Sequence, residues 1–135
     1  MRFLLILAVL LLSTPVWAAI DNEQAVVALM GEAGGQSDEE LLAHAYALKN
    51  RGTLRGVYGL YAKHTPHYKD EECWQRVSGA WWTALLGDDD PVSGRTEWRS
   101  EFDLKLMSER GETPDSMGLY DPIKVGETYF YRLRK

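Results

Sequence analysis

Apolar side chains recur at the spacing of an α-helix in three stretches of the chain. Each stretch opens on a residue whose side chain can cap free backbone amides, and each closes on glycine. The stretches run from Asp21 to Gly34, from Ser37 to Gly52 and from Asp70 to Gly87. In the first two, Gln24 and Glu40 stand where the second half of a capping box belongs. The pattern therefore predicts three amphipathic helices.

The remaining segments have a less regular pattern. Residues 53–68 mix glycine and proline with tyrosine and predict an irregular aromatic loop, and residues 88–94 predict a turn. Apolar residues between Trp98 and Met107 have helical spacing, whereas residues 111–122 predict a loop. Residues 128–133 are rich in strand formers, so we expect a short strand or extended segment that docks onto the helices. The fold class expected is mainly α.

Residues 1–18 have the composition of a secretory signal peptide. Arg2 gives a positive start, an apolar run extends from Phe3 to Leu12, and small residues follow at Ala18 and Ala19. An uncleaved membrane anchor is the rival interpretation, but a run of about 10 residues is shorter than the ~20 that span a bilayer. We expect cleavage after Ala18, export to the periplasm or beyond the cell, and no stable membrane insertion afterwards. Residues 19–135 then form a single domain.

Composition narrows the classes of function. A chain of 135 residues suffices for one core, and its formal net charge of -5 lacks the basic footprint of a nucleic-acid-binding protein. A single Cys excludes an intramolecular disulfide framework and a cysteine-based zinc knuckle. The 5 Trp and 7 Tyr are many for a small domain and become relevant if the ligand is a sugar.

Glu32 is the candidate catalytic residue. It lies on the last turn of the first expected helix, one position from the apolar stripe and just before Gly34 and Gly35. A carboxylate in this position can be partly desolvated at the mouth of a groove, which suits a general acid. A solvent-facing glutamate at a helix end has the same spacing, so the spacing alone leaves both interpretations open.

Three blocks of sequence occur in a fixed order. Residues 30–36 read M-G-E-A-G-G-Q and lead to a helix that closes in L-K-N-R, residues 84–94 read A-L-L-G-D-D-D-P-V-S-G, and residues 123–131 read I-K-V-G-E-T-Y-F-Y. Together they resemble the SleB-type cell wall hydrolases, a family that includes spore cortex-lytic enzymes. The family's segments read roughly G-E-A-x-G-E with L-N-R, G-x-x-D-P-T-x-G-A and I-G-x-H-x-F-Y. The chain departs from them at Gln36, Arg95 and Thr128.

The resemblance implies a small, lysozyme-like helical domain that cuts the glycan strands of peptidoglycan without a cofactor. Such lytic transglycosylases and muramidases use the motif glutamate, here Glu32, to protonate the bridging oxygen between two sugars and then to act as a base. Deprotonation of the sugar's own 6-hydroxyl gives a 1,6-anhydro product, whereas activation of water gives hydrolysis. A transglycosylase needs no second catalytic carboxylate, so we favour that route. Asn50, in the L-N-R position, is carried over as a candidate substrate-binding residue.

Aromatic residues are the other candidate substrate-binding groups. Ring faces of Tyr and Trp stack on the apolar faces of pyranoses. Tyr58 and Tyr61 lie in the expected loop after the second helix, and Trp82 is adjacent to Trp81 but on a different helical face. Packing in the core or as loop anchors is the alternative for each of these rings, and Trp81 has the spacing of a core residue.

Other constellations fit their chemistry poorly. His64 and His67 with Asp70 could supply ligands to zinc, but a proline between the histidines breaks helical geometry and no third histidine is near. Asp88 to Asp90 lacks the oxygen ligands of a calcium loop at the following positions. Cys73 is flanked by two glutamates that disfavour a thiolate, which predicts a buried, inert thiol. No metal or cofactor is therefore expected.

The sequence leaves two classes of function in view. One is an exported glycosidase that acts on peptidoglycan glycan strands through Glu32. The alternative is a non-catalytic module of the same fold that binds glycan or an unidentified periplasmic protein. An enzyme requires the carboxylate of Glu32 in its groove, whereas a binding module tolerates glutamine at this position.

Overall fold

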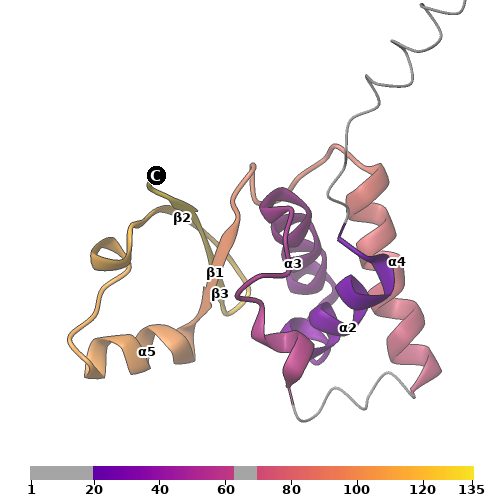
Figure 1. The fold of residues 1–135 in the computed structure, drawn as a ribbon, viewed down its shortest axis with the longest axis horizontal. Coiled ribbons are helices and arrows are strands. Elements are labelled where there is room, and N and C mark those ends of the chain that lie inside the picture. Colours follow the sequence, from indigo (N-terminus) through magenta and orange to yellow (C-terminus); the bar gives the residue numbers. More distant parts are fainter. Residues whose placement is uncertain (1–19, 63–69) are drawn as a thin grey trace, which may run out of the picture.

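The computed structural model describes residues 20–62 and 70–135, and its elements are drawn in Figure 1. Residues 1–18, with the expected signal peptide, and His64 and His67 lie outside the described ranges. The domain is mainly helical and carries a small antiparallel sheet. In chain order its elements are α2 (Asn22–Ala33), α3 (Asp38–Arg51), η1 (Tyr58–Tyr61), α4 (Glu71–Leu86), β1 (Glu97–Ser100), α5 (Glu101–Glu109), η3 (Asp115–Met117), β2 (Leu119–Val125) and β3 (Thr128–Leu133).

The three helices expected from apolar spacing are confirmed, and their caps explain their ends. Asp21 accepts a hydrogen bond from the Gln24 amide at 2.9 Å, and Ser37 accepts one from the Glu40 amide at 3.2 Å. Gly52 ends α3 in the left-handed conformation with φ 73°, where a side chain would be strained. The Glu40 side chain, however, accepts a hydrogen bond from Thr128 Oγ1 at 3.3 Å instead of closing a capping box.

The core lies where α2, α3 and α4 meet and continues onto one face of the sheet. The largest fully buried side chains include Trp81 of α4 and Phe130 of β3. Trp81 also donates its indole N–H to Asn22 Oδ1 at 2.9 Å, which satisfies the polar atom of this core residue. The apolar stripes predicted for the helices therefore face this core.

The sheet has the order β1-β3-β2, and β1 corrects the expectation of a helix across residues 98–107. Trp98 pairs with Phe130 of β3, and only after Ser100 does the chain enter α5. Ser100 and Asp103 form a reciprocal capping box that separates the strand from the helix. The helical spacing was therefore misleading, since Trp98 packs toward the core whereas Phe102 is 66% exposed.

The loop expected over residues 111–122 is also partly wrong, because β2 already begins at Leu119. The strand tolerates Pro122 because its register with β3 shifts between Tyr120 and Ile123, as at a β-bulge. The turn at residues 88–94 and the strand at residues 128–133 are confirmed.

Figure 1 shows α2, α3 and α4 on one side of the sheet and α5 with η3 on the other. The sheet thus carries α5 away from the helical core and positions it opposite α2 and η1. Within the described part of the chain, none of the helices has the length and apolar character needed to cross a bilayer.

Candidate active site

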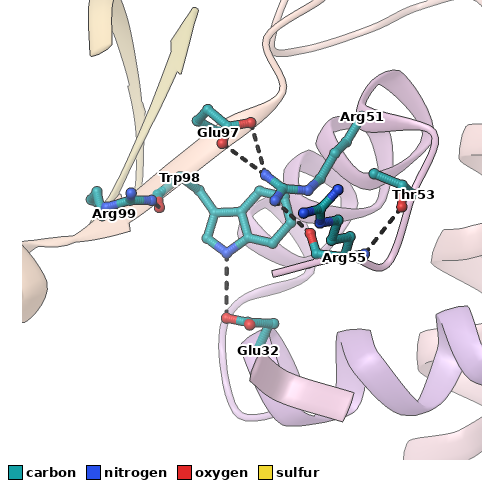
Figure 2. Close-up of polar contacts among 7 residues, drawn as sticks. All are labelled: Glu32, Arg51, Thr53, Arg55, Glu97, Trp98 and Arg99. Carbon is teal, nitrogen blue, oxygen red and sulfur yellow. Dashed lines mark hydrogen bonds and ion pairs between the residues drawn. The ribbon is translucent and has the colours of Figure 1, made fainter. Parts of the chain in front are cut away.

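Glu32 lies on the last turn of α2, and two other elements hold its carboxylate. The Gly59 amide of η1 donates to Oε1 at 2.9 Å, and the Trp98 indole N–H of β1 donates to Oε2 at 3.3 Å. Figure 2 shows the indole pointing at the carboxylate from the strand above it. Both oxygens are therefore oriented by donors from different parts of the chain.

Two glycines allow η1 to approach α2 closely enough for this contact. A Cβ on Gly31 would lie 2.0 Å from the Gly59 carbonyl oxygen, and one on Gly59 would lie 2.6 Å from Glu32 Cγ. Either distance is a severe overlap, so larger residues at these positions would force the two elements apart. The glycine before Glu32 in the sequence motif is thus explained by the close approach of η1 to α2 at that position.

A cavity of about 620 Å³, called here the main cavity, opens beside Glu32. One wall comes from α2, α3, η1 and the segment leading into η1. The other comes from β1, α5, the loop that follows α5, and η3. Its described lining residues are Glu32, Arg51, Gly56, Tyr58, Glu97, Trp98, Arg99, Asp103, Leu106, Met107, Arg110, Glu112 and Met117.

Glu32 also lines a second, smaller cavity of about 380 Å³. This cavity is formed by residues 30–36 at the end of α2 together with Asp70 and Cys73 at the start of α4. The Gln36 Oε1 atom is buried without a hydrogen-bond partner among the described residues. Glu32 thus lines both cavities.

An ion pair frames the main cavity beside Trp98. Arg51 Nη1 donates to both carboxylate oxygens of Glu97 at 2.8 Å, and its Nη2 donates to the Arg55 carbonyl at 2.7 Å (Figure 2). The Arg51 guanidinium also lies 5.9 Å from the centre of the Trp98 ring. Glu97 therefore lines the cavity, but both of its carboxylate oxygens are already hydrogen-bonded to Arg51.

His44 supports Trp98 from the core side. Its ring centre is 5.6 Å from that of Trp98 and 5.0 Å from that of Phe130, both edge-on. With Nδ1 protonated, the ring donates to the Glu40 carbonyl at 2.8 Å. Burial lowers the pKa of His44 below its usual 6.5, against opposing contributions from Glu40 and Glu32. The ring beneath Trp98 is therefore neutral at pH 7.

The structure separates the aromatic residues proposed from the sequence. Tyr58 lines the main cavity and is 80% exposed, so its ring is free to meet a ligand. Tyr61 is equally exposed but is not among the described residues that line either cavity. Trp82, on α4, is 48% exposed and is likewise absent from the described linings. Of these three rings, Tyr58 is the one that shares a described cavity lining with Glu32.

Asn50 has a different environment from the one expected of a substrate-binding residue. Its side-chain amide donates to Asp90 Oδ2 at 2.8 Å and to the Arg95 carbonyl at 3.1 Å, and it is not among the described lining residues. Burial by itself would raise the pKa of Asp90. The hydrogen bonds from Asn50 and from the Gly94 and Val92 amides, with the charge of Lys49, outweigh burial and hold that pKa below its ordinary value. Asn50 therefore holds the turn at residues 88–94 through its hydrogen bonds to Asp90 and Arg95.

Arg95 and Thr128, where the chain departs from the family pattern, also have structural contacts. The buried Arg95 guanidinium pairs with Asp121 Oδ2 at 2.9 Å and bonds to the Val92 carbonyl at 3.0 Å, which joins the turn to β2. Thr128 is buried against Glu40 of α3. Both residues tie the sheet to the helical part of the domain.

The sequence did not indicate that β1 and α5 together line a cavity. Trp98 and Arg99 fall in the segment expected to be helical, and Glu97 lies just before it. The signal available was the S-x-x-D pattern from Ser100 to Asp103, which marks a helix start and therefore a different structure before it.

The chemistry of the site is that of one oriented carboxylate at an open cavity, able to give or take a proton. Among the described residues, no three His, Cys, Asp or Glu side chains are grouped to hold a metal ion. Comparison of the chain with family models, curated proteins and solved structures found no match. A function must therefore be argued from the residues themselves.

Proposed function

We propose that this protein cleaves the glycan strands of peptidoglycan, with Glu32 as the general acid and then the general base. The observation that carries the proposal is the placement of Glu32, which lines two adjoining cavities while donors from η1 and β1 orient its two oxygens. A helical domain with a small sheet and a groove-lining glutamate at a helix end supports a lysozyme-like architecture. The three sequence blocks support the same assignment.

The hydrogen bonds at Glu32 suggest which oxygen carries the proton. The Gly59 amide holds Oε1 at 2.9 Å, whereas the bond from Trp98 to Oε2 is longer at 3.3 Å and leaves that oxygen more available. Oε2 then protonates the bridging oxygen as the bond from the anomeric carbon to that oxygen breaks. The electron pair of the broken bond stays on the bridging oxygen, and positive charge develops at the anomeric carbon.

The second step returns the proton to Glu32. The 6-hydroxyl oxygen of the same sugar bonds to the anomeric carbon while its proton passes to the Glu32 carboxylate, which yields a 1,6-anhydro end. Glu97, the nearest carboxylate in sequence to Trp98, accepts two hydrogen bonds from Arg51 and is poorly suited to serve as a second catalytic group. This engagement favours the transglycosylase route over hydrolysis, which in the common two-carboxylate schemes needs a partner acid.

The main cavity also suits a saccharide in size and lining. Its volume of about 620 Å³ falls in the range of small-molecule sites. Tyr58 offers an exposed ring for stacking, and Arg51, Glu97 and Asp103 add polar groups to the same lining.

The direct test compares wild type with Glu32→Gln on purified peptidoglycan sacculi, with mass spectrometry of the released muropeptides. Loss of the proton-transfer group should reduce release by roughly 10²- to 10⁴-fold. Glu39→Gln, on the exposed side of α3, is the matched control and should release as much as wild type. Anhydro ends would identify a transglycosylase and reducing ends a hydrolase.

Two results would contradict the proposal. Equal release by wild type and folded Glu32→Gln would exclude Glu32 as the catalytic group. Retention of wild type on sacculi without any release would favour the alternative, a binding module.

A further inference from the structure

We propose that Arg99 forms a carboxylate-binding subsite in the main cavity, which makes the substrate a glycan strand whose muramic acid carries a free carboxylate nearby. This inference rests on the proposed function, because it specifies which part of the strand the same cavity recognises. The ligand group is a carboxylate. It is either the lactyl carboxylate of a muramic acid without a peptide or, where a peptide is joined to that lactyl group as an amide, a carboxylate of the peptide.

Three guanidinium groups line the main cavity in the described part of the chain. Arg51 is bonded to Glu97 and to a backbone carbonyl. Arg110 lies 4.0 Å from Glu112. Arg99 donates through Nη1 to the Trp98 carbonyl at 2.7 Å, and within residues 20–62 and 70–135 no carboxylate lies at ion-pair distance from it. Arg99 therefore brings a charge and unused donors to the cavity.

The acidic side chains of the same lining are engaged elsewhere. Glu97 is bonded to Arg51, and Asp103 Oδ2 accepts the Ser100 amide at 2.9 Å, which fixes it at the start of α5. Glu112 is the neighbour of Arg110, and Glu32 is held by η1 and β1. An incoming carboxylate thus meets a guanidinium whose charge no described residue pairs. A guanidinium binds carboxylate with two parallel hydrogen bonds, which gives both energy and orientation.

The position of Arg99 fits a branch of the substrate better than its sugar backbone. Trp98, the preceding residue, points to Glu32, and consecutive side chains of a strand point to opposite faces. Figure 2 shows Arg99 beside the backbone of Trp98 on β1, apart from Glu32 and Arg51. The lactyl ether and its peptide branch sideways from the glycan. Because Arg99 and Glu32 line the same cavity, this branch is assigned to Arg99 and the glycosidic bond to Glu32.

The test measures binding, so that it does not depend on cleavage. Calorimetry compares three ligands: the N-acetylglucosaminyl-N-acetylmuramic acid disaccharide with its tetrapeptide, the same disaccharide without peptide, and neutral chitobiose. Wild type should bind at least one of the two muramic acid ligands about tenfold or more tightly than chitobiose. Arg99→Gln should lose this preference and keep the affinity for chitobiose. Lys105→Gln, which removes an exposed charge of α5 outside the described lining, should behave as wild type.

The peptide-free disaccharide identifies the source of the carboxylate. If Arg99→Gln weakens only the peptide-free disaccharide, the lactyl carboxylate is the ligand group, and if it weakens only the tetrapeptide ligand, the peptide supplies the carboxylate. If it weakens both, the subsite accepts a carboxylate from either source. Should Arg99→Gln fail to fold, the ligand that wild type prefers, with its carboxyl groups converted to amides, gives the same comparison on wild type, with an expected loss of about tenfold.

The inference is overturned if wild type binds none of the ligands, if it binds all three equally, or if Arg99→Gln keeps the preference or weakens chitobiose to the same degree. A charge preference that depends on Arg99, found in a protein that releases nothing from sacculi, would uphold the subsite and reject cleavage. Release from sacculi without any such preference would uphold cleavage and reject the subsite.

Discussion

At the scale of single residues, the site depends on what holds Glu32. The residue was named from the sequence because it lies in a short motif at a helix end. Its two hydrogen-bond donors could not be named, because Gly59 is 27 and Trp98 is 66 positions away along the chain. Contacts of that range are set by how elements pack, and local patterns carry little information about them.

Replacing Trp98 by phenylalanine tests the contribution of the indole N–H. The variant keeps a ring between Arg51 and His44 but loses the donor to Glu32 Oε2, so the released muropeptides should fall roughly tenfold while the melting temperature changes little. Trp82→Phe, a change on α4 outside the described linings, is the control. Unchanged release by Trp98→Phe would mean that the indole does not orient the acid.

At the scale of elements, the helices and strands set by neighbouring residues were predicted correctly, and those set by contacts between distant segments were not. Asp21, Ser37 and Asp70 cap their helices as their side chains suggested, because capping involves neighbours in sequence. β1 was mistaken for helix, since its pairing with β3 is a long-range contact. β2 was mistaken for a loop because Pro122 indicates a break in a strand, whereas here a register shift accommodates it within the strand.

The contact between η1 and α2 gives a prediction at this scale. In Gly59→Ala the new methyl group would overlap Glu32 Cγ and the Ala28 carbonyl oxygen, so η1 must move and the free energy of unfolding should fall by about 1–3 kcal/mol. Release from sacculi should fall with it, because the Oε1 donor moves.

Gly79→Ala is the matched control for that experiment. Gly79 lies within α4, where an added Cβ meets no described atom within 4 Å, and alanine is the better helix former by roughly 1 kcal/mol. Urea unfolding should show Gly79→Ala equal to or above wild type in stability. A Gly59→Ala protein as stable as wild type would show that the close approach is not needed.

At the scale of the whole molecule, the helical core and the sheet meet at His44. The residue is on α3, its ring contacts Trp98 of β1 and Phe130 of β3, and burial keeps it neutral. Glu32 and Glu40 are the charged groups that act on it, and both favour protonation less strongly than burial opposes it. Protonation of this ring would put a charge at the junction between the two parts.

Stability should therefore fall as the pH drops below 6.5. The unfolded chain takes up a proton on His44 near that value, whereas the folded protein resists it, so the contribution of the neutral ring is complete above pH 6.5 and is lost progressively toward the lower native pKa. Urea unfolding at pH 7.5 and pH 5.5 measures this loss. His44→Phe should show a smaller loss than wild type.

The same comparison separates His44 from the other histidines. His64 and His67 are present in both proteins, so their contribution cancels in the difference between wild type and His44→Phe. Equal pH dependence in the two proteins would show that the buried ring does not control acid sensitivity.

The hydrogen bonds at Glu32 also join two walls that are far apart in the chain, since one bond comes from η1 and the other from β1. In the proposed reaction, Glu32 becomes fully charged at the moment it has given up its proton. A charged acceptor binds these donors more strongly. In the proposed reaction, η1 and β1 would thus be held to Glu32 most strongly just after the glycosidic bond breaks, and less strongly once the proton returns.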